Sequence, residues 1–397
     1  MIIKPRIRGF ICTTAHPTGC RTHIEKQIKY ITDRSKIKSG PKRVLIIGAS
    51  TGYGLSSRIT AAFGCSASTV GVFFERPGLA NKPGSAGWYN SAVFEELATI
   101  QGLYAFNVNG DAYSYSVQNK TVELIKKDLG QVDLIIYSLA APRCTHPQTG
   151  KVFNAVLKPI GKPLKTRGIN TDTEKMIDIS LTPASPIEIH DTVTVMGGEN
   201  WYRWIYKLIQ ENALAKGAKT IAFTYLGGKI THDIYWNGSI GSAKKDLDKY
   251  ALSIRDMLIK HCQGDARVAV LRSVVTQSSA AIPMMSLYLS LLFKIMKEKK
   301  IHEGCIEQIY GLFNDNLYSP KQILDNVGRI RMDAVEITND IQETIFQLWN
   351  SVNNNNLYTM TDIIGYKKEF MKLFGFHWED VNYDKHVNPI LTMRKII

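Results

Sequence analysis

The sequence predicts an α/β fold in which helices cover both faces of a doubly wound, parallel sheet. Two observations lead to this prediction: short β-branched runs alternate with longer helical patterns, and a glycine-rich turn follows the first of these runs. The 397 residues are 44% hydrophobic and 21% charged, so the chain can bury a sizeable core in one large domain or two. This composition excludes the disordered, collagen-like and small disulfide-rich classes of protein.

Six short apolar runs are the predicted strands of this sheet. Longer helical patterns separate them, as crossover connections between parallel strands require, so we expect the strands to run parallel. The runs are residues 44–47, 69–74, 104–108, 132–137, 220–224 and 268–271.

The two ends of the chain lie outside this alternation. We expect residues 1–40 to form an N-terminal cap at the edge of the sheet and residues 41–280 to form the core. Residues 281–397 begin with an apolar helix and continue as a mostly helical C-terminal region, with a loop at the asparagine run 353–356. Neither end carries a linker, so these parts belong to one enlarged domain.

The charge of the chain favours a polyanionic partner. Lysine and arginine number 49 against 35 aspartates and glutamates, a net charge of +14, which attracts polyanions over a long range. Nucleic acid, a phosphate-bearing substrate and an acidic carrier protein are compatible with this charge, as is a basic surface that is only solvated. The basic residues are spread along the chain, and no arginine-rich tail or recognised nucleic-acid module is present.

The sequence does not predict membrane insertion or secretion. The longest apolar stretch, residues 282–296, is interrupted by Ser286, Ser290 and Lys294 and is too short to span a bilayer as a helix. The first residues, MIIKPRIRGF, place charges among apolar residues and contain no continuous apolar h-region of a secretory signal. We therefore expect a cytoplasmic protein.

The cysteines predict neither disulfides nor a metal site. They form no C-x-x-C pair and have no histidines at zinc spacing, which favours reduced thiols that serve in packing. The six are Cys12, Cys20, Cys65, Cys144, Cys262 and Cys305.

A nucleotide-binding turn follows the first predicted strand. The residues from Gly48 to Leu55 read G-x-x-x-G-x-G and open a helix. Glycines let the backbone turn tightly and approach a pyrophosphate, whose charge the N–H groups at the start of the helix stabilise. An ordinary strand-to-helix turn is the alternative, but Glu75 at the end of the second strand favours a dinucleotide site in a Rossmann-type fold.

Residues that follow the next strands indicate which dinucleotide binds. A carboxylate at Glu75 accepts hydrogen bonds from the ribose hydroxyls and repels a 2′-phosphate, so it favours NAD over NADP. The neighbouring Arg76 weakens this inference, because an arginine there can accommodate the phosphate. Asp111 is placed to reach the adenine or only to form a turn, and Leu139 and Ala140 are placed to line the nucleotide crevice.

Two tyrosines and a lysine follow the fifth predicted strand. They are Tyr225, Tyr235 and Lys244, and the lysine stands at the start of a helical pattern. A phenol donates a proton at neutral pH when a nearby ammonium stabilises its ionised form, and that ammonium can also hold the nicotinamide ribose. Tyr235 and Lys244 have this chemistry, although packing residues of the same types are the alternative.

The Tyr-x8-Lys spacing from Tyr235 to Lys244, together with the glycine turn, resembles that of the FabV-type trans-2-enoyl reductases. These are enlarged relatives of the short-chain dehydrogenase/reductases, in which the two residues are usually closer together. The resemblance covers nearly the whole chain. It includes the segments MIIKPRIRGFICTTAHPTGC, FFERPG, AGWYN, GDA, THDIYWNGSIG, VVTQSSAAIPMM and HEGCIEQ.

The resemblance implies NADH-dependent reduction of the trans-2 double bond of enoyl-acyl carrier protein or enoyl-CoA, the last step of the fatty-acid elongation cycle. It implies that Tyr235 donates the proton, that Lys244 binds the nicotinamide ribose and that Tyr225 contacts the thioester carbonyl. The implied cofactor contacts are Gly48, Ala49, Ser50, Thr51, Gly52 and Tyr53 at the pyrophosphate, Phe74 and Glu75 at the adenosine, Asp111 and Ala112 at the adenine, Leu139 and Ala140 in the crevice, and Ser273, Val274, Val275 and Thr276 at the nicotinamide.

The apolar segment from Ser278 to Phe293 is a candidate wall of the substrate pocket. As a helix it would be apolar on most of its surface, which suits either an acyl chain or a position in the core. The resemblance favours the acyl chain. The residues that it implies as contacts are Ile282, Met285, Leu287 and Leu291.

Two other functions stay open at this point. A short-chain carbonyl reductase would use the same cofactor on a ketone, and a dinucleotide-sensing or nucleic-acid-binding protein would use the fold without turnover. For the leading function we expect NADH as the cofactor and no metal. The expected partner is an enoyl thioester on acyl carrier protein or coenzyme A, with no nucleic-acid partner, and we expect a monomer.

Overall fold

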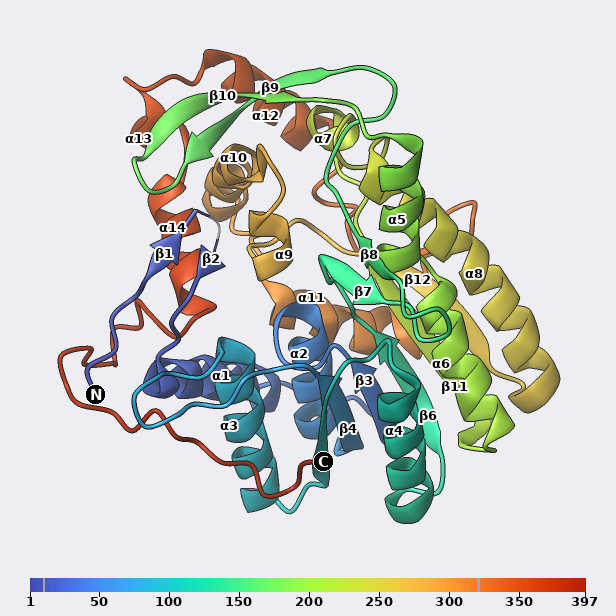
Figure 1. Ribbon diagram of the computed structural model, residues 1–397. Helices are drawn as coiled ribbons and strands as arrows, with labels where there is room; N and C mark the ends of the chain where they lie inside the picture. The colour runs from blue at the N-terminus through green and yellow to red at the C-terminus, as the bar shows by residue number, and fades with distance from the viewer. Residues whose placement is uncertain (10, 320–321) are drawn as a thin grey trace.

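A parallel sheet of seven strands forms the centre of the computed structural model, which describes residues 1–9, 11–319 and 322–397 (Figure 1). The strand order is β13-β12-β11-β6-β3-β4-β5, and every neighbouring pair is parallel. The order reverses between β3 and β6, which opens a crevice at their carboxyl ends, as in Rossmann-type folds. The strands are β3 (Arg43–Ile47), β4 (Ser68–Phe73), β5 (Ala105–Asn109), β6 (Val132–Tyr137), β11 (Leu214–Thr224), β12 (Asp265–Val270) and β13 (Ile330–Arg331).

The predicted α/β fold and all six predicted strands are confirmed. β11 begins well before residue 220, because a register shift between Leu214 and Lys219 lets it continue along β6. β13 was not predicted, since a strand of two residues has no readable alternation. It pairs with β12 at Ala269 and Val270 and extends the sheet by one strand.

Alternate residues of β3 contribute to two different cores. Leu45 and Ile47 pack on one face with apolar residues of α4, α6 and α8, whereas Val44 and Ile46 belong to the core of the other face. Helices α1, α2 and α3 share a further cluster with each other. The bounds of these helices are α1 (Pro17–Thr32), α2 (Gly52–Ile59), α3 (Ala86–Ile100), α4 (Tyr115–Asp128), α6 (Glu199–Gln210) and α8 (Ser239–Cys262).

A further layer stands above the carboxyl ends of the strands (Figure 1). The antiparallel hairpin of β9 (Leu164–Asn170) and β10 (Lys175–Leu181) lies over α10 (Met285–Glu298). α12 (Asn339–Ser351) and α14 (Ile363–Lys372) also pack on α10. The predicted loop at 353–356 follows α12. Helices are the main regular structure of the C-terminal region, although residues 373–397 form none, and the hairpin was not predicted.

The remaining elements are short, except for α5. They are β1 (Ile7–Arg8), β2 (Ile11–Cys12), η1 (Thr60–Gly64), β7 (Arg143–Thr145), β8 (Val152–Asn154), α5 (Pro186–Met196), α7 (Lys229–His232), α9 (Gln277–Ala280), α11 (Cys305–Gly311), η2 (Leu312–Leu317) and α13 (Leu357–Met360). Of the cysteines, Cys12, Cys20, Cys65 and Cys144 are buried. Among the described residues, no helix has both the length and the hydropathy needed to cross a membrane.

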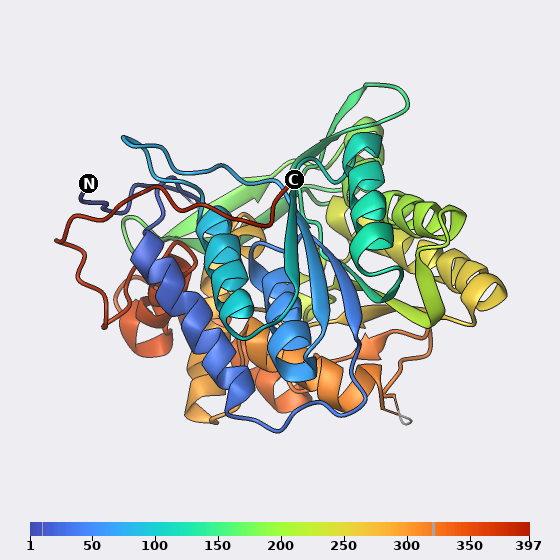
Figure 2. The same cartoon turned by 90° about the horizontal axis from the view of Figure 1, so that it is seen from below.

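The last residues of the chain complete the β5 edge of the sheet. The Asn107 N–H donates to the Lys395 carbonyl oxygen at 2.8 Å, and the Asn109 N–H donates to that of Ile397 at 2.9 Å. Figure 2 shows the C-terminus beside this edge. The first forty residues, which we expected at the sheet edge, instead contribute α1, which packs against α2 and α3.

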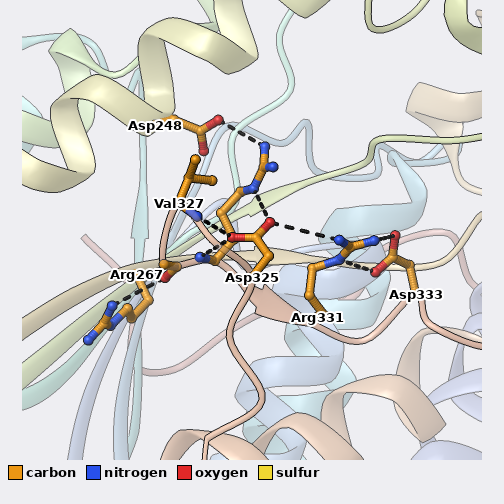
Figure 3. A network of polar contacts seen from close by, with 8 residues as sticks. Asp248, Arg267, Asp325, Val327, Arg331 and Asp333 are labelled. Carbon is orange, nitrogen blue, oxygen red and sulfur yellow. Dashed lines mark hydrogen bonds and ion pairs between the residues drawn. The ribbon is translucent and has the colours of Figure 1, made fainter.

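An ionic network fixes the opposite edge of the sheet (Figure 3). Arg331 of β13 forms two hydrogen bonds of 2.7 Å with the Asp333 carboxylate. Arg329 bonds to Asp325 at 2.8 Å and to Asp248 of α8 at 3.1 Å. The segment around β13 is thereby tied to α8, the helix that carries Lys244.

Candidate active site

The predicted phosphate turn joins β3 to α2 through a closely packed backbone. Gly48 has a φ of +90° and Gly52 a φ of +54°, backbone angles that residues with a side chain rarely adopt. A Cβ atom on Gly54 would lie 1.9 Å from the Gly48 carbonyl oxygen. Thr51 is the N-cap residue of α2, and its side chain makes no capping bond within the described chain. The first amide groups of α2 are therefore directed at the place where a pyrophosphate would lie.

The Tyr53 side chain does not point toward that turn. Its hydroxyl lies 2.8 Å from the Arg272 carbonyl oxygen and 3.0 Å from Gln308 Oε1, and can donate to either. Burial raises the pKa of this phenol well above its usual value. Of the predicted pyrophosphate contacts, Tyr53 can thus contribute only its backbone, while its side chain ties α2 to the end of β12 and to α11.

Glu75 lies beside the phosphate turn, as its position in the sequence predicts. Its Oε1 accepts a hydrogen bond of 2.7 Å from Ser50 Oγ, and its backbone N–H donates to Asn109 Oδ1 at 2.8 Å. Burial raises the pKa of the carboxyl, although hydrogen bonds from Ser85 and Ser50 and the charge of Arg76 oppose this. The adjacent Phe74 is 79% exposed, so its ring is free to contact an adenosine.

The other adenosine candidates surround the same crevice. Asp111 follows β5, and its Oδ1 accepts a hydrogen bond of 2.9 Å from the Tyr113 N–H, so this aspartate does form a turn. Ala112 is buried behind it. A Cβ atom on Gly48 would lie 3.3 Å from Leu139 Cδ2, which places the segment with Ala140 next to the phosphate turn. Adenine contacts of Asp111 and Ala112 stay a prediction.

The predicted nicotinamide segment, residues 273–276, follows β12 and approaches the phosphate turn. A Cβ atom on Gly52 would lie 3.6 Å from the Thr276 methyl carbon. Thr276 caps α9, because its Oγ1 accepts a hydrogen bond of 3.1 Å from the Ser279 N–H. The Ser273 N–H donates to Glu336 Oε2 at 2.6 Å. The structure therefore brings the pyrophosphate and nicotinamide candidates together at the carboxyl ends of the strands.

The two candidate tyrosines are in contact. The Tyr225 and Tyr235 ring centroids are 5.0 Å apart, with the ring planes at 80°. The Tyr225 hydroxyl donates to Glu336 Oε1 at 2.9 Å, whereas the Tyr235 hydroxyl has no hydrogen-bond partner in the described part of the chain. Burial raises the pKa of Tyr235, so this phenol is protonated at neutral pH and is a donor without an acceptor of its own.

Lys244 lies near the start of α8, at the carboxyl end of β11. Its Nζ donates to the Phe223 carbonyl oxygen at 3.4 Å. Burial lowers the pKa of the ammonium to about 8, although the charge of Asp248 opposes this. Tyr235 lies in the turn before α8, and a Cβ atom on Gly241 would lie 2.5 Å from its carbonyl oxygen. The wide Tyr-x8-Lys spacing thus results from a turn that separates the two residues and packs against the helix.

Glu336 is a residue of this site that the sequence did not indicate. It is fully buried, at 0% exposure, and contacts Tyr225, Ser273 and Tyr288. It lies far from all three in the sequence and in no motif, so only the fold brings it there. A glutamate close to the short strand β13 carries no signal of its own.

The predicted substrate helix is interrupted: α9 ends at Ala280, Ile282 lies between the two helices, and α10 begins at Met285, with all four candidate residues in the interior. Ile282 is 9% exposed, Met285 2%, and Leu287 and Leu291 are both at 0%. They belong to the same apolar cluster as Tyr235 and Val275. α10 is linked to Tyr225 through Tyr288, because both hydroxyls contact Glu336 Oε1, and acyl-chain contact by the candidate residues stays a prediction.

Three family profiles match the chain in succession. Residues 2–80 match the NAD(P)H binding domain of trans-2-enoyl-CoA reductase, residues 82–318 match the trans-2-enoyl-CoA reductase catalytic region, and residues 324–387 match an enoyl reductase FAD binding domain. The first match contains the phosphate turn and Glu75. The second contains Tyr225, Tyr235 and Lys244.

Residues 324–387 do not fit a flavin dinucleotide. Asp340 lies in the first turn of α12, and Asp362 is the N-cap residue of α14. Carboxylates at both helix N-termini occupy the positions where a pyrophosphate would need N–H groups and positive charge. The buried Asp333 and Glu336 are bonded within the protein. This segment contributes β13 to the sheet and α12 and α14 to the layer above it, and we assign no flavin to it.

Named relatives match the chain over its whole length. The enoyl-[acyl-carrier-protein] reductase [NADH] of Erwinia tasmaniensis is 65% identical and that of Yersinia pestis (strain Pestoides F) is 59% identical, each over 100% of both chains. Crystal structures of trans-2-enoyl-CoA reductases are also similar. That from Clostridium acetobutulicum with NADH has a TM-score of 0.95 at 40% identity, covering 98% of each chain. That from Treponema denticola with NAD has 0.94 at 41%, covering 99% of this chain and 100% of that one.

The site and the relatives agree on one family. The glycine turn, Glu75, the tyrosine pair and Lys244 all follow the carboxyl ends of strands of the sheet. The matches with relatives extend from one end of the chain to the other. The chain belongs to the trans-2-enoyl-CoA and enoyl-acyl-carrier-protein reductase family.

Proposed function

We propose that this protein uses NADH to reduce the trans-2 double bond of an enoyl thioester, the last step of the fatty-acid elongation cycle. The observation that carries the proposal is the place of the Tyr235 hydroxyl: it has no hydrogen-bond partner in the described chain, and it belongs to a side chain that is 7% exposed and packs against Tyr225. Relatives named for this reaction match the whole chain.

The chemistry of the substrate sets what the protein must supply. Conjugation with the thioester makes C3 electrophilic, and negative charge develops on the carbonyl oxygen when hydride adds there. NADH, when bound, supplies that hydride. Tyr235 donates a hydrogen bond to the developing oxyanion, which stabilises it more in the transition state than in the ground state. Tyr225, whose ring packs against that of Tyr235, contacts the thioester carbonyl in this proposal.

The Lys244 ammonium has two roles in this proposal. It holds the ribose of the nicotinamide nucleotide, and its positive charge stabilises the oxyanion and the Tyr235 phenol. The Phe223 carbonyl oxygen, 3.4 Å from Nζ, orients it. Protonation of C2 then completes the saturated acyl thioester.

The carrier of the acyl group is acyl carrier protein or coenzyme A. Both carry negative charge, which suits a chain whose net charge is +14. A cytoplasmic location, a monomeric state and the absence of a nucleic-acid partner stay predictions.

An NADH oxidation assay tests this function. The purified chain should oxidise NADH, measured by the loss of its absorbance, when crotonyl-CoA is added, and should not do so with butyryl-CoA. Activity with a simple ketone but not with crotonyl-CoA would indicate the carbonyl reductase instead. Retention on nucleic acid without any NADH oxidation would indicate a binding protein.

The carboxylate of Glu75 should make the enzyme prefer NADH. Its repulsion of a 2′-phosphate disfavours NADPH by at least ~1.4 kcal/mol, which is about tenfold in apparent affinity. Steady-state measurement of kcat/KM with each cofactor gives this ratio. In Glu75→Gln the amide retains the shape of the side chain but removes the charge. The ratio of kcat/KM with NADH to kcat/KM with NADPH should therefore move closer to one.

The matched control for that experiment is Glu123→Gln, a change of the same kind at an exposed position of α4. It should leave the cofactor ratio as it is in the wild type. Equal kcat/KM values with NADH and NADPH in the wild-type protein would contradict the role of Glu75.

The acyl-chain role of α10 predicts an effect that depends on chain length. Leu291→Phe narrows a channel along this helix, so kcat/KM for a dodecenoyl thioester should fall about tenfold while that for crotonyl-CoA changes less than about threefold. The control is Leu289→Phe, which is equally buried but points to another side of the helix. Equal losses for both chain lengths, together with a lower melting temperature, would show that Leu291 only packs in the core.

A further inference from the structure

Glu336 links three parts of the candidate site that come from distant segments of the chain. Its carboxylate contacts Tyr225 beyond β11, Ser273 in the nicotinamide segment and Tyr288 of α10. At 0% exposure it is fully buried. A buried carboxylate is costly unless hydrogen bonds satisfy it, so its position here requires an explanation.

The two carboxylate oxygens have different surroundings. Oε2 accepts the Ser273 N–H at 2.6 Å. Oε1 faces three hydroxyl groups: Tyr225 at 2.9 Å, Ser273 at 3.0 Å and Tyr288 at 3.0 Å. One carboxylate oxygen has about two lone-pair directions. Oε1 thus has more donors than it can fully use, and one hydroxyl can redirect its hydrogen at little cost.

Hydrogen bonds offset part of the cost of burying the Glu336 carboxylate and hold it in place. Burial raises the pKa of Glu336, and the hydrogen bonds from Ser273, Tyr225 and Tyr288 oppose this shift. Gln342 Nε2 donates to the Glu336 carbonyl oxygen at 2.8 Å and to the Tyr288 hydroxyl at 3.3 Å. The network of Figure 3 fixes the preceding residues through Arg331 and Asp333. The Glu336 side chain is therefore held both by the groups that contact its carboxylate and by the bonds that fix the backbone around it.

We propose that Glu336 is a positioning residue of the reductase, which holds the Tyr225 phenol and the nicotinamide segment in one fixed arrangement. This inference rests on the proposed function. Glu336 accepts the Tyr225 hydrogen in the free enzyme and fixes the position of that ring against Tyr235. Tyr235 therefore remains the hydroxyl that is available to the substrate, and Tyr225 can redirect its hydrogen from Oε1 only when negative charge develops on the thioester oxygen and makes it a competing acceptor.

The substitution Glu336→Gln should keep the contact with the Ser273 N–H and remove the contact with the Tyr225 hydroxyl. The amide oxygen must face the Ser273 N–H, because the opposite orientation would bring two N–H donors together at the 2.6 Å position. The amide NH2 then replaces Oε1 and cannot accept the Tyr225 hydrogen. The nicotinamide segment stays anchored, while the tyrosine loses its acceptor.

We expect Glu336→Gln to lower kcat for crotonyl-CoA by about tenfold and to change the KM for NADH by less than about threefold. The decisive measurement is a double-mutant cycle with Tyr225→Phe. Because Glu336 acts through that phenol, adding Glu336→Gln to Tyr225→Phe should lower kcat by less than about twofold more. Glu343→Gln, at an exposed position of α12, is the matched control and should keep wild-type kinetics.

Two results would overturn this inference, provided that the wild-type protein reduces crotonyl-CoA. One is that the effects of the two substitutions on kcat multiply, which would mean that Glu336 acts independently of Tyr225. The other is a large rise in the KM for NADH with unchanged kcat, which would make Glu336 a support of the cofactor segment alone. An inactive wild-type protein would instead refute the proposed function.

A second variant keeps the test decisive if Glu336→Gln does not fold. Tyr288→Phe removes one of the hydroxyls that face Oε1 and keeps the ring that packs in the core. It should lower kcat by about threefold in the wild-type background and have no further effect in Tyr225→Phe. Independent effects in this cycle would also contradict the role of Glu336.

Discussion

Replacing Tyr235 by phenylalanine should lower kcat for crotonyl-CoA by about a hundredfold or more, while the NADH affinity stays within about twofold of the wild type. The Tyr235 side chain is 7% exposed, and its hydroxyl has no acceptor in the described chain, so its hydrogen bond is available to the substrate. It becomes strong only when charge develops on the thioester oxygen. Steady-state reduction of crotonyl-CoA measures the first quantity, and NADH fluorescence titration measures the second.

The control for this prediction is Tyr206→Phe, since Tyr206 is 48% exposed on α6 and should tolerate the change. Near-normal turnover in Tyr235→Phe would transfer the donor role to Tyr225. A large loss of NADH affinity would show that Tyr235 binds the cofactor and is not the proton donor.

Replacing Lys244 by methionine should affect both cofactor binding and turnover. Loss of the ribose contacts should raise the dissociation constant of NADH by about tenfold, and loss of the charge near the oxyanion should lower kcat by about a hundredfold. The adjacent Lys245→Met is the matched control, because Lys245 is exposed and its Nζ lies over the Trp236 ring, 5.0 Å from the centroid. Unchanged NADH affinity in Lys244→Met would contradict the ribose contact.

The buried environment of Lys244 also predicts a pH dependence. Burial lowers its pKa to about 8, so the ammonium is present below this pH and loses its proton above it. The kcat/KM for NADH should therefore fall as the pH rises through about 8. A pH profile that stays flat through this range would show that the charge of Lys244 does not support cofactor binding.

Periodicity predicts the sheet well and the layer above it less well. Buried parallel strands such as β3 and β6 read as continuous apolar runs, and the glycine turn marks the point where the chain leaves the first of them. The β9–β10 hairpin gives no such signal, because polar residues interrupt its apolar ones and few of its residues are fully buried. The pairing of the last residues with β5 depends on contacts between segments that lie far apart in the sequence.

The residues of the site also differ in how well the sequence predicts their positions. Gly48, Glu75 and Tyr235 each stand at a fixed place relative to a strand, so topology alone brings them together. The inward direction of the Tyr53 side chain could not be foreseen, since its partners Arg272 and Gln308 come from remote segments. Glu336 is the extreme case, because its role follows only from three partners that the fold collects around it.

The position of solvent hydrogen in the product tests the central claim most directly. Crotonyl-CoA is reduced with unlabelled NADH in heavy water, and the butyryl-CoA is examined by NMR and mass spectrometry. If an exchangeable donor such as Tyr235 completes the reaction after hydride has added to C3, the product should carry one deuterium, at C2. Deuterium at C3, or a protein that leaves crotonyl-CoA unreduced, would contradict the proposed reaction.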